Sequence, residues 1–136
     1  MGISSYYRPV VPKQSKTANY SNAAISASTF YTVLSATSGR GILSRVALVG
    51  YGTAFTNSNL QIRITIDGVA NTITGGSGLY ARGLVHNAAY TDNSGIAGNC
   101  FDYFCNTTFT TSLQVEVMYN TTPVVALYAV VDYQIE

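Results

Sequence analysis

The sequence has few of the residues that carry most enzyme chemistry. Among 136 residues there are one histidine, two cysteines and no tryptophan, and only 10% are Asp, Glu, Lys or Arg, against about 25% in an ordinary soluble domain. No nucleophile-elbow or phosphate-loop motif is present. No second histidine or acidic residue stands at metal-ligand spacing around His86. These absences argue against an enzyme, a metal site and a bound cofactor.

The chain also lacks a strong net charge and a long hydrophobic run. Its net charge is +1, so no overall field attracts nucleic acid or a membrane surface. The N-terminus lacks the pattern of a signal peptide. The longest apolar run, residues 124–131, has eight residues, far below the roughly 18 that span a membrane. We expect cytoplasmic synthesis and no nucleic-acid or membrane partner. Cys100 and Cys105 are expected to be buried or free thiols, with a local disulfide as the alternative.

The residues that are abundant alternate as they do in β-strands. In residues 59–68, NLQIRITIDG, apolar residues alternate with polar ones, and residues 112–119, SLQVEVMY, do the same. A period of two is typical of a strand with one buried face. About eight such segments are separated by turn formers, and none has an apolar stripe at helical spacing. The sequence therefore predicts an all-β fold, an antiparallel, jelly-roll-like β-sandwich.

The dipeptide Asp67-Gly68 is the strongest hairpin signal in the chain. A two-residue loop at this point sets the register of both strands and puts Asn71 opposite Ile64 on the apolar face. This conflict would be resolved by a bulge or by a short return strand. Another turn is expected at residues 39–41, where two glycines flank an arginine.

Two regions differ in composition. Residues 1–24 hold two of the three prolines, three basic residues and no acid, whereas residues 25–136 hold four arginines, six acids and no lysine. We expect residues 25–136 to form the sandwich. Residues 1–24 are expected to form an extended arm, because Pro9 and Pro12 favour extended backbone. The arm is either a frayed tail or a segment that docks on a neighbouring subunit, and its aromatic residues favour docking.

The last strand, residues 124–135, is apolar on both faces along most of its length. A strand in a two-layer sandwich normally has one wet face. Either this strand is central and covered by loops, or its outer face meets another subunit; low charge and exposed tyrosine favour the second interpretation. The expected subunit contacts are Tyr128, Val130, Tyr133 and Ile135.

Two arginines, Arg45 and Arg63, fall on the outer faces of strands that are expected to be neighbours. They form either a charged edge that discourages aberrant strand pairing or salt bridges between subunits. The candidate acids for such bridges are Asp67, Asp102 and Glu116. The sequence leaves both interpretations open.

A carbohydrate- or receptor-binding module of the lectin type is a second functional class. Its site would lie in loops at residues 51–59 and 87–99, where tyrosine stacks on a sugar and amide or carboxylate groups bind its hydroxyls. The candidate residues are Tyr51, Asn57, Tyr90, Asp92 and Asn93. The expected ligand of such a site is a host surface glycan.

Three segments, in order, carry a resemblance to a known family: GRGILSRVALVGYG, NLQIRITIDGV and TTSLQVEVMY. They resemble small β-sandwich virion proteins of tailed bacteriophages, which serve as head decorations, head fibres or tail adhesion modules. The resemblance spans roughly residues 36–119 and implies a homo-oligomer, commonly a trimer, on the particle surface. It implies other virion proteins, such as the major capsid protein, as partners, synthesis in the host cytoplasm, and no catalytic residues. The candidates for attachment to the particle are Tyr6, Tyr7, Arg8, Pro9 and Val10.

Overall fold

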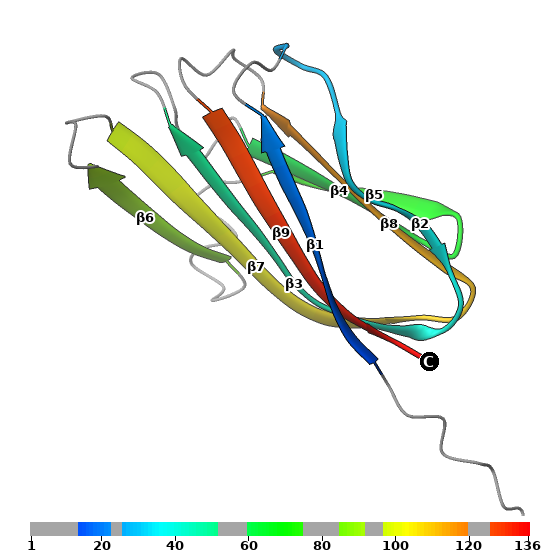
Figure 1. The fold of residues 1–136 in the computed structure, drawn as a ribbon. Helices are drawn as coiled ribbons and strands as arrows, with labels where there is room; N and C mark the ends of the chain where they lie inside the picture. The colour runs from blue at the N-terminus through cyan, green and yellow to red at the C-terminus, as the bar shows by residue number, and fades with distance from the viewer. Residues whose placement is uncertain (1–13, 23–25, 52–59, 75–84, 92–96, 120–125) are drawn as a thin grey trace, which may run out of the picture.

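The computed structural model describes residues 14–22, 26–51, 60–74, 85–91, 97–119 and 126–136 (Figure 1). These residues form β-strands and no helix, so the described part of the chain has no helix that could cross a membrane. The strands are β1 (Gln14–Asn22), β2 (Tyr31–Ser38), β3 (Gly41–Tyr51), β4 (Leu60–Ile66), β5 (Val69–Thr74), β6 (Val85–Thr91), β7 (Ala97–Phe109), β8 (Ser112–Tyr119) and β9 (Ala126–Ile135).

The strands form two antiparallel sheets that face each other. Sheet A has the order β1-β9-β3-β7-β6, and sheet B has the order β2-β8-β4-β5. The chain crosses between the sheets from β2 to β3 and from β7 to β8, and both crossings lie at the end of the molecule that holds the C-terminus (Figure 1). The predicted all-β antiparallel sandwich is confirmed, with nine strands rather than about eight. The jelly-roll connectivity stays a prediction.

The core lies between the sheets and is formed by alternate residues of the strands. Sheet B contributes the apolar positions of the two segments whose alternation is clearest in the sequence, and sheet A contributes β3 and β9. The side chains at 0% exposure include Leu60, Ile62, Leu113, Val115, Val117, Tyr119, Leu43, Val46, Leu48, Leu127 and Val131. Each such side chain stabilises the fold by about 1.5–3 kcal/mol relative to leaving it exposed.

The predicted hairpin at Asp67-Gly68 is confirmed, including its register. Both residues have positive φ, 50° and 84°, as a type I′ turn requires. Asn71 lies opposite Ile64, and β4 and β5 pair without a register shift, so of the two resolutions expected, a bulge or a short return strand, the structure has the second. The conflict is resolved because β5 is a short edge strand of which only Ile73 is partly covered. Asn71 is therefore in water although its partner is buried.

The boundary of the sandwich lies earlier than expected. Residues 14–22, which the sequence placed in the arm, form β1 and pair along their whole length with β9. Two of its side chains, Ala18 and Tyr20, pack against the core, and the rest of the strand is polar, which hides its alternation. Residues 1–13 of the expected arm, including all five attachment candidates, lie outside the described residues.

Two other boundaries differ from what the sequence indicates. Residues 26–36 are rich in β-branched, aromatic and hydroxyl residues, a composition typical of a strand, but the strand begins only at Tyr31, and Ser28 has a positive φ of 56°. The loop expected over residues 87–99 is mostly strand, because residues 87–91 belong to β6 and residues 97–99 to β7.

Candidate functional site

The four expected subunit contacts on β9 point to opposite faces of sheet A. Tyr128 is 43% exposed, whereas its neighbours Leu127 and Ala129 are buried. By the same alternation Val130 faces outward, while Tyr133 packs against the core and Ile135 lies on the inward side, near Gly39. The strand is also central, between β1 and β3. Only Tyr128 and Val130 therefore remain available for a contact on the outer face.

The outer face of sheet A carries a patch of exposed aromatic side chains around an ionic centre. Phe104 on β7 is 55% exposed, more than Tyr128 on β9. Between them, Ala47 of β3 is paired with Val130 on one side and with Asp102 on the other. We call this surface the outer patch; it consists of Arg45, Ala47, Asp102, Phe104, Tyr128, Val130 and Asp132.

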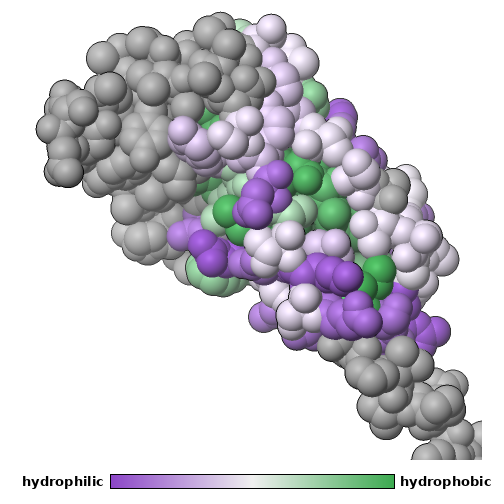
Figure 2. All heavy atoms as spheres, in the orientation of Figure 1, coloured by the Kyte–Doolittle hydropathy of each residue, from purple (hydrophilic) through white to green (hydrophobic). Residues whose placement is uncertain are grey.

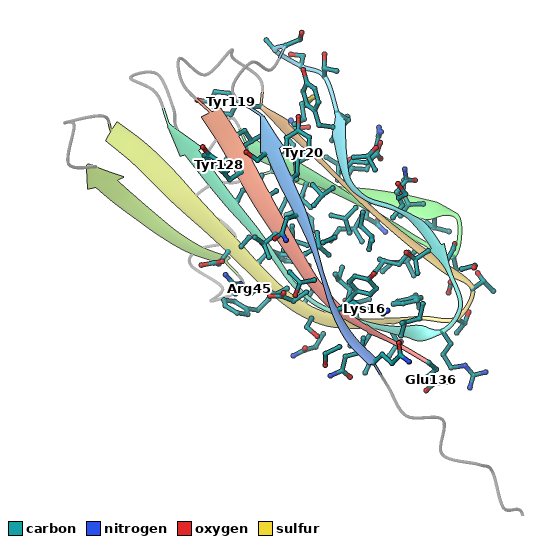
Figure 3. All side chains as sticks on the ribbon, in the orientation of Figure 1. Lys16, Tyr20, Arg45, Tyr119, Tyr128 and Glu136 are labelled. Atoms are coloured by element: carbon teal, nitrogen blue, oxygen red, sulfur yellow. The ribbon has the colours of Figure 1, made fainter. Side chains whose placement is uncertain are left out.

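The figures show how this patch is placed. Arg45 and Tyr128 project from sheet A away from sheet B, whereas Tyr20 projects toward sheet B (Figure 3). Hydrophobic residues reach the surface between hydrophilic ones on the face in view (Figure 2). The outer patch itself combines the exposed rings of Phe104 and Tyr128 with Arg45, and aromatic residues and arginine are enriched in protein interfaces.

The ionic centre of the outer patch is Arg45. Its Nε lies 3.2 Å from Oδ1 of Asp102 and its Nη1 lies 3.5 Å from Oδ2 of Asp132, and its guanidinium carbon lies 5.9 Å from the ring centroid of Phe104. Thr17 of β1 donates a hydrogen bond of 2.9 Å to Asp132. One arginine between two aspartates leaves a net negative charge of one. Because Arg45 is 40% exposed, each ion pair contributes about 1 kcal/mol or less.

Sheet B has an arginine of its own, and its outer face is arranged differently. Arg63 of β4 makes a bidentate pair with Glu116 of β8, at 2.6 Å and 2.8 Å, and its guanidinium carbon lies 3.9 Å from the ring centroid of Phe30. Hydrogen bonding to Glu116 raises the pKa of Arg63. Arg45 and Arg63 therefore lie on different sheets, not on neighbouring strands, and both pair with acids of their own chain.

Asp67 has a role that the sequence did not indicate. Its carboxylate accepts hydrogen bonds of 2.7–3.1 Å from the amides of Thr110, Thr111 and Ser112 and from both threonine hydroxyls. Backbone hydrogen bonds, led by those from Thr111 and Ser112, hold the pKa of Asp67 well below its usual range. The Asp-Gly pair predicts the hairpin but not the partner turn, which lies more than 40 residues away.

The residues expected to bind a glycan are only partly described. Asn57, Asp92 and Asn93 lie outside the described residues. Tyr51 and Tyr90 lie on strands rather than loops, at the ends of β3 and β6. Strand β7 lies between β3 and β6, and its Gly98 is paired with Tyr51 on one side and with Tyr90 on the other.

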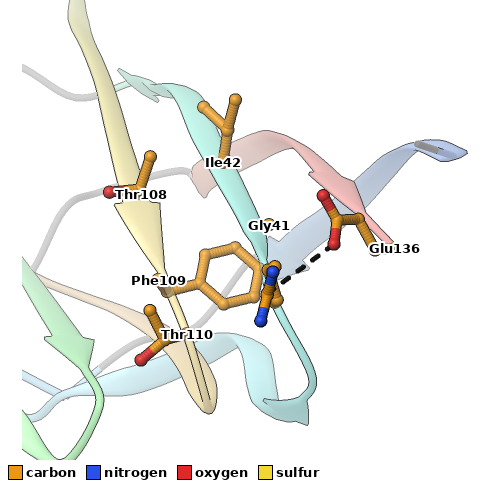
Figure 4. Close-up of a pocket in the computed structure, with 7 residues that line it drawn as sticks. Gly41, Ile42, Thr108, Phe109, Thr110 and Glu136 are labelled. Atoms are coloured by element: carbon orange, nitrogen blue, oxygen red, sulfur yellow. Dashed lines mark ion pairs between the residues drawn. The ribbon is translucent and has the colours of Figure 1, made fainter. Parts of the chain in front are cut away.

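A cavity of about 360 Å³ opens at the end of the sandwich where the chain crosses between the sheets (Figure 4). The ion pair across it joins Nε of Arg40 to Oε2 of Glu136 at 3.7 Å, and the Arg40 side chain is 64% exposed. The cavity is lined by Arg40, Gly41, Ile42, Thr108, Phe109, Thr110 and Glu136. This lining has one acid, one base and no nucleophile beyond threonine hydroxyls, so it supports no evident reaction.

Cys105 is a free thiol with little reactivity. It is half-buried on β7 and donates a weak hydrogen bond, 3.6 Å long, to the carbonyl of Leu43. Burial raises the pKa of the Cys105 thiol to about 11, so it stays protonated at neutral pH. Elsewhere in the described ranges, no three His, Cys, Asp or Glu residues gather in a way that could hold a metal ion.

No family model matches the sequence, and a search of curated proteins finds no match.

Proposed function

We propose that the protein is a non-enzymatic structural protein of a bacteriophage particle, which associates with further copies of itself and attaches to the particle surface. The observation that carries this proposal is the outer patch, where Phe104 and Tyr128 are 55% and 43% exposed. Large aromatic side chains contribute much of the binding energy in protein interfaces. The expected assembly is a trimer, and a head decoration protein or a tail component are equal candidates for its place.

The charge distribution supports a separate role for the first residues. Residues 1–13, which precede β1, hold two basic residues, Arg8 and Lys13, and no acid, and the remainder of the chain has a charge of −1. A basic, tyrosine-rich segment complements the acidic outer patch of another copy or an acidic surface of the major capsid protein. Attachment through Tyr6 to Val10 is part of the proposal.

The first test removes the aromatic side chains of the outer patch. Phe104→Ser combined with Tyr128→Ser should lower the association of purified protein by about tenfold or more, measured as mass by light scattering over a concentration series. Thr32→Ser, an exposed change on sheet B, is the matched control and should associate like the wild type. Unchanged association of the double variant would contradict the outer patch as the contact.

The second test concerns attachment. Deletion of residues 2–12 removes the attachment candidates and leaves β1, which begins at Gln14. The truncated protein should keep the β circular dichroism spectrum of the full chain and lose binding to virions, measured by co-sedimentation. Full occupancy of virions by the truncated protein would refute the attachment role.

Glycan binding is the second candidate, and one observation favours it. Tyr51 and Tyr90 lie opposite the same glycine, Gly98, and aromatic residues spaced across a residue without a side chain suit the stacking of a sugar ring. Binding of the protein to a glycan array or to bacterial cells, lost on Tyr51→Ala and Tyr90→Ala, would establish this function. No binding to any glycan or cell favours the structural role.

A further inference from the structure

The free edge of sheet B, strand β5, has the properties of a strand-pairing site. It pairs with β4 on one side, and no other described strand pairs with it on the other. Its side chains are largely in water, and Val69 is 65% exposed. An open edge with unpaired N–H and C=O groups is a template for another strand.

This edge lacks the usual protection. Its sequence, VANTIT, has no charge and no proline, and its register with β4 has no bulge. The opposite edge of sheet B, β2, is irregular at two places in its pairing with β8. The β1 edge of sheet A carries Lys16. Bulges and lysines discourage edge pairing. The remaining edge, β6 of sheet A, pairs with β7 without a register shift and carries no lysine or acid, so β5 and β6 are the two regular edges of the described strands. Of these two, β5 is the one whose side chains are described and lie largely in water.

The hairpin geometry shows which backbone groups are available. In a two-residue hairpin the residues that flank the turn form a hydrogen-bonded pair, and such pairs then alternate along the strands. Ile66 and Val69 are that first pair. The N–H and C=O groups of Val69, Asn71 and Ile73 therefore bond to β4, whereas those of Ala70, Thr72 and Thr74 point to the open side.

We propose that β5 pairs antiparallel with β5 of a second copy of this chain, about a two-fold axis at Thr72. In this register Thr72 pairs with the second copy's Thr72, and Ala70 pairs with its Thr74. All three outward residues then form hydrogen-bonded pairs, about six backbone hydrogen bonds in total. Facing threonines stabilise a strand pair, and no like charges meet. The same strand is thus its own complement, which is why a second copy is the occupant.

The contact closes on itself. Two-fold pairing uses the open edge of β5 in both copies, and the far edges of the joined sheet are the irregular β2 strands. The product is a dimer rather than a fibre.

The contact is weak in solution, because two six-residue strands bury less than the roughly 800 Å² per partner of a standard interface. The inference rests on the proposed self-association and adds to it a second contact, the β5 edge of sheet B. Its test does not depend on the outer patch.

The first experiment removes one outward N–H group. Thr72→Pro deletes the donor at the centre of the contact, and proline is tolerated at an edge position whose N–H faces solvent. In a background that carries Phe104→Ser and Tyr128→Ser, so that the outer patch does not contribute, sedimentation velocity over a concentration series should give concentration-dependent dimers of the 14.5 kDa chain with Thr72 and with Thr72→Ser, which keeps the N–H group. Thr72→Pro should weaken dimerisation by about tenfold or more. Association of Thr72→Pro equal to that of Thr72→Ser overturns the proposal.

A second experiment keeps the proposal testable if the proline variant does not fold. Thr72→Cys places two thiols at a hydrogen-bonded pair about 5.5 Å apart between Cα atoms, within disulfide reach. Mild oxidation should give a covalent dimer for Thr72→Cys but not for Thr32→Cys on the β2 edge. The wild type is oxidised in parallel to account for Cys100 and Cys105. Equal cross-linking at both edges overturns the proposal.

The outer-patch double variant separates the two contacts. Phe104→Ser with Tyr128→Ser should leave the Thr72→Cys cross-link intact, because these side chains lie on sheet A. If the double variant abolishes this cross-link, β5 is not an independent contact and this inference fails while the proposed function stands. If the cross-link persists and the double variant associates normally by mass, the outer patch fails instead.

Discussion

Two of the crossings between the sheets, β2–β3 and β7–β8, lie side by side and are built in different ways. The β2–β3 crossing uses glycine: Gly39 has a φ of 128°, and Gly41 begins β3 against the backbone of β9. The β7–β8 crossing has no glycine, and the Asp67 carboxylate of the distant β4–β5 hairpin binds its amides. The amide of Gly39 donates a 2.9 Å hydrogen bond to the carbonyl of Thr111, which joins the two crossings.

The two crossings show two ways in which the conformation of a turn in a sandwich is determined. A glycine relieves crowding at its own position, so its removal acts locally and sterically. A carboxylate organises a turn elsewhere in the chain, so its removal acts at a distance and depends on pH. Four substitutions test this distinction, beginning with the one of largest expected effect.

Gly41→Ala should destabilise the protein most. The added Cβ would overlap the carbonyl oxygen of Gln134 in β9 and would lie 2.6 Å from Cζ of Phe109, which is buried at 1% exposure. A backbone atom cannot rotate away, so β9 itself would have to shift. We expect a loss of about 3 kcal/mol or more in the free energy of unfolding, measured by urea denaturation followed by circular dichroism. A midpoint close to that of the wild type would show that this crossing is not sterically limited.

Asp67→Asn should have the second largest effect and a distinctive pH dependence. Asparagine tolerates the positive φ at this position, so the hairpin is kept while the charged acceptor is lost. We expect Tm to fall by about 5 °C at neutral pH.

The direction of this pH dependence follows from the lowered pKa of Asp67. A depressed folded-state pKa stabilises the fold fully above the unfolded-state pKa, about 3.9, and the contribution decreases progressively as pH falls from that value through the lower folded-state pKa. The difference in Tm between wild type and Asp67→Asn should therefore begin to shrink below about pH 4 and continue to shrink at lower pH. A difference that is constant with pH would mean that the carboxylate charge does not hold the turn.

The two crossings also show what the sequence could predict. The glycine turn at residues 39–41 and the hairpin at Asp67-Gly68 follow from local backbone chemistry, and both were predicted. The bond from Asp67 to Thr111 was not, because it depends on how three turns meet at one end of the fold. The two residues are 44 positions apart, and no local sequence pattern indicates that they meet.

The outer patch was also predicted only in part. Apolar residues on both faces of the last strand indicated that part of it is exposed, and Tyr128 and Val130 lie on the outer face of sheet A. Tyr133 was expected on the same surface but packs against the core, a place that follows from the alternation visible in the sequence. Phe104 was missed, although it alternates with Tyr103, which packs against the core. Strand β1 was missed because seven of its nine residues are neither apolar nor packed on the core.

Gly68→Ala is the matched control for Gly41→Ala. A Cβ at Gly68 would have no atom within 4 Å, but φ is +84°, so the cost is conformational rather than steric. A side chain in this region costs about 1 kcal/mol, and Tm should fall by a few degrees. If both alanine variants lose the same stability in urea denaturation, backbone conformation and not crowding governs the glycine crossing.

Arg40→Ala should have the smallest effect, although Arg40 lies between Gly39 and Gly41 in the same crossing. Its side chain is 64% exposed and its ion pair with Glu136 is 3.7 Å long, a geometry that contributes about 0.5 kcal/mol or less. The amide of Glu136 donates to the carbonyl of Arg40, and that backbone bond survives the substitution. Urea midpoints within error of the wild type are therefore expected at low and at high salt. A clear, salt-dependent loss of stability would show that the Arg40–Glu136 ion pair stabilises the β2–β3 crossing. This crossing would then depend on charge as well as on the small size of glycine.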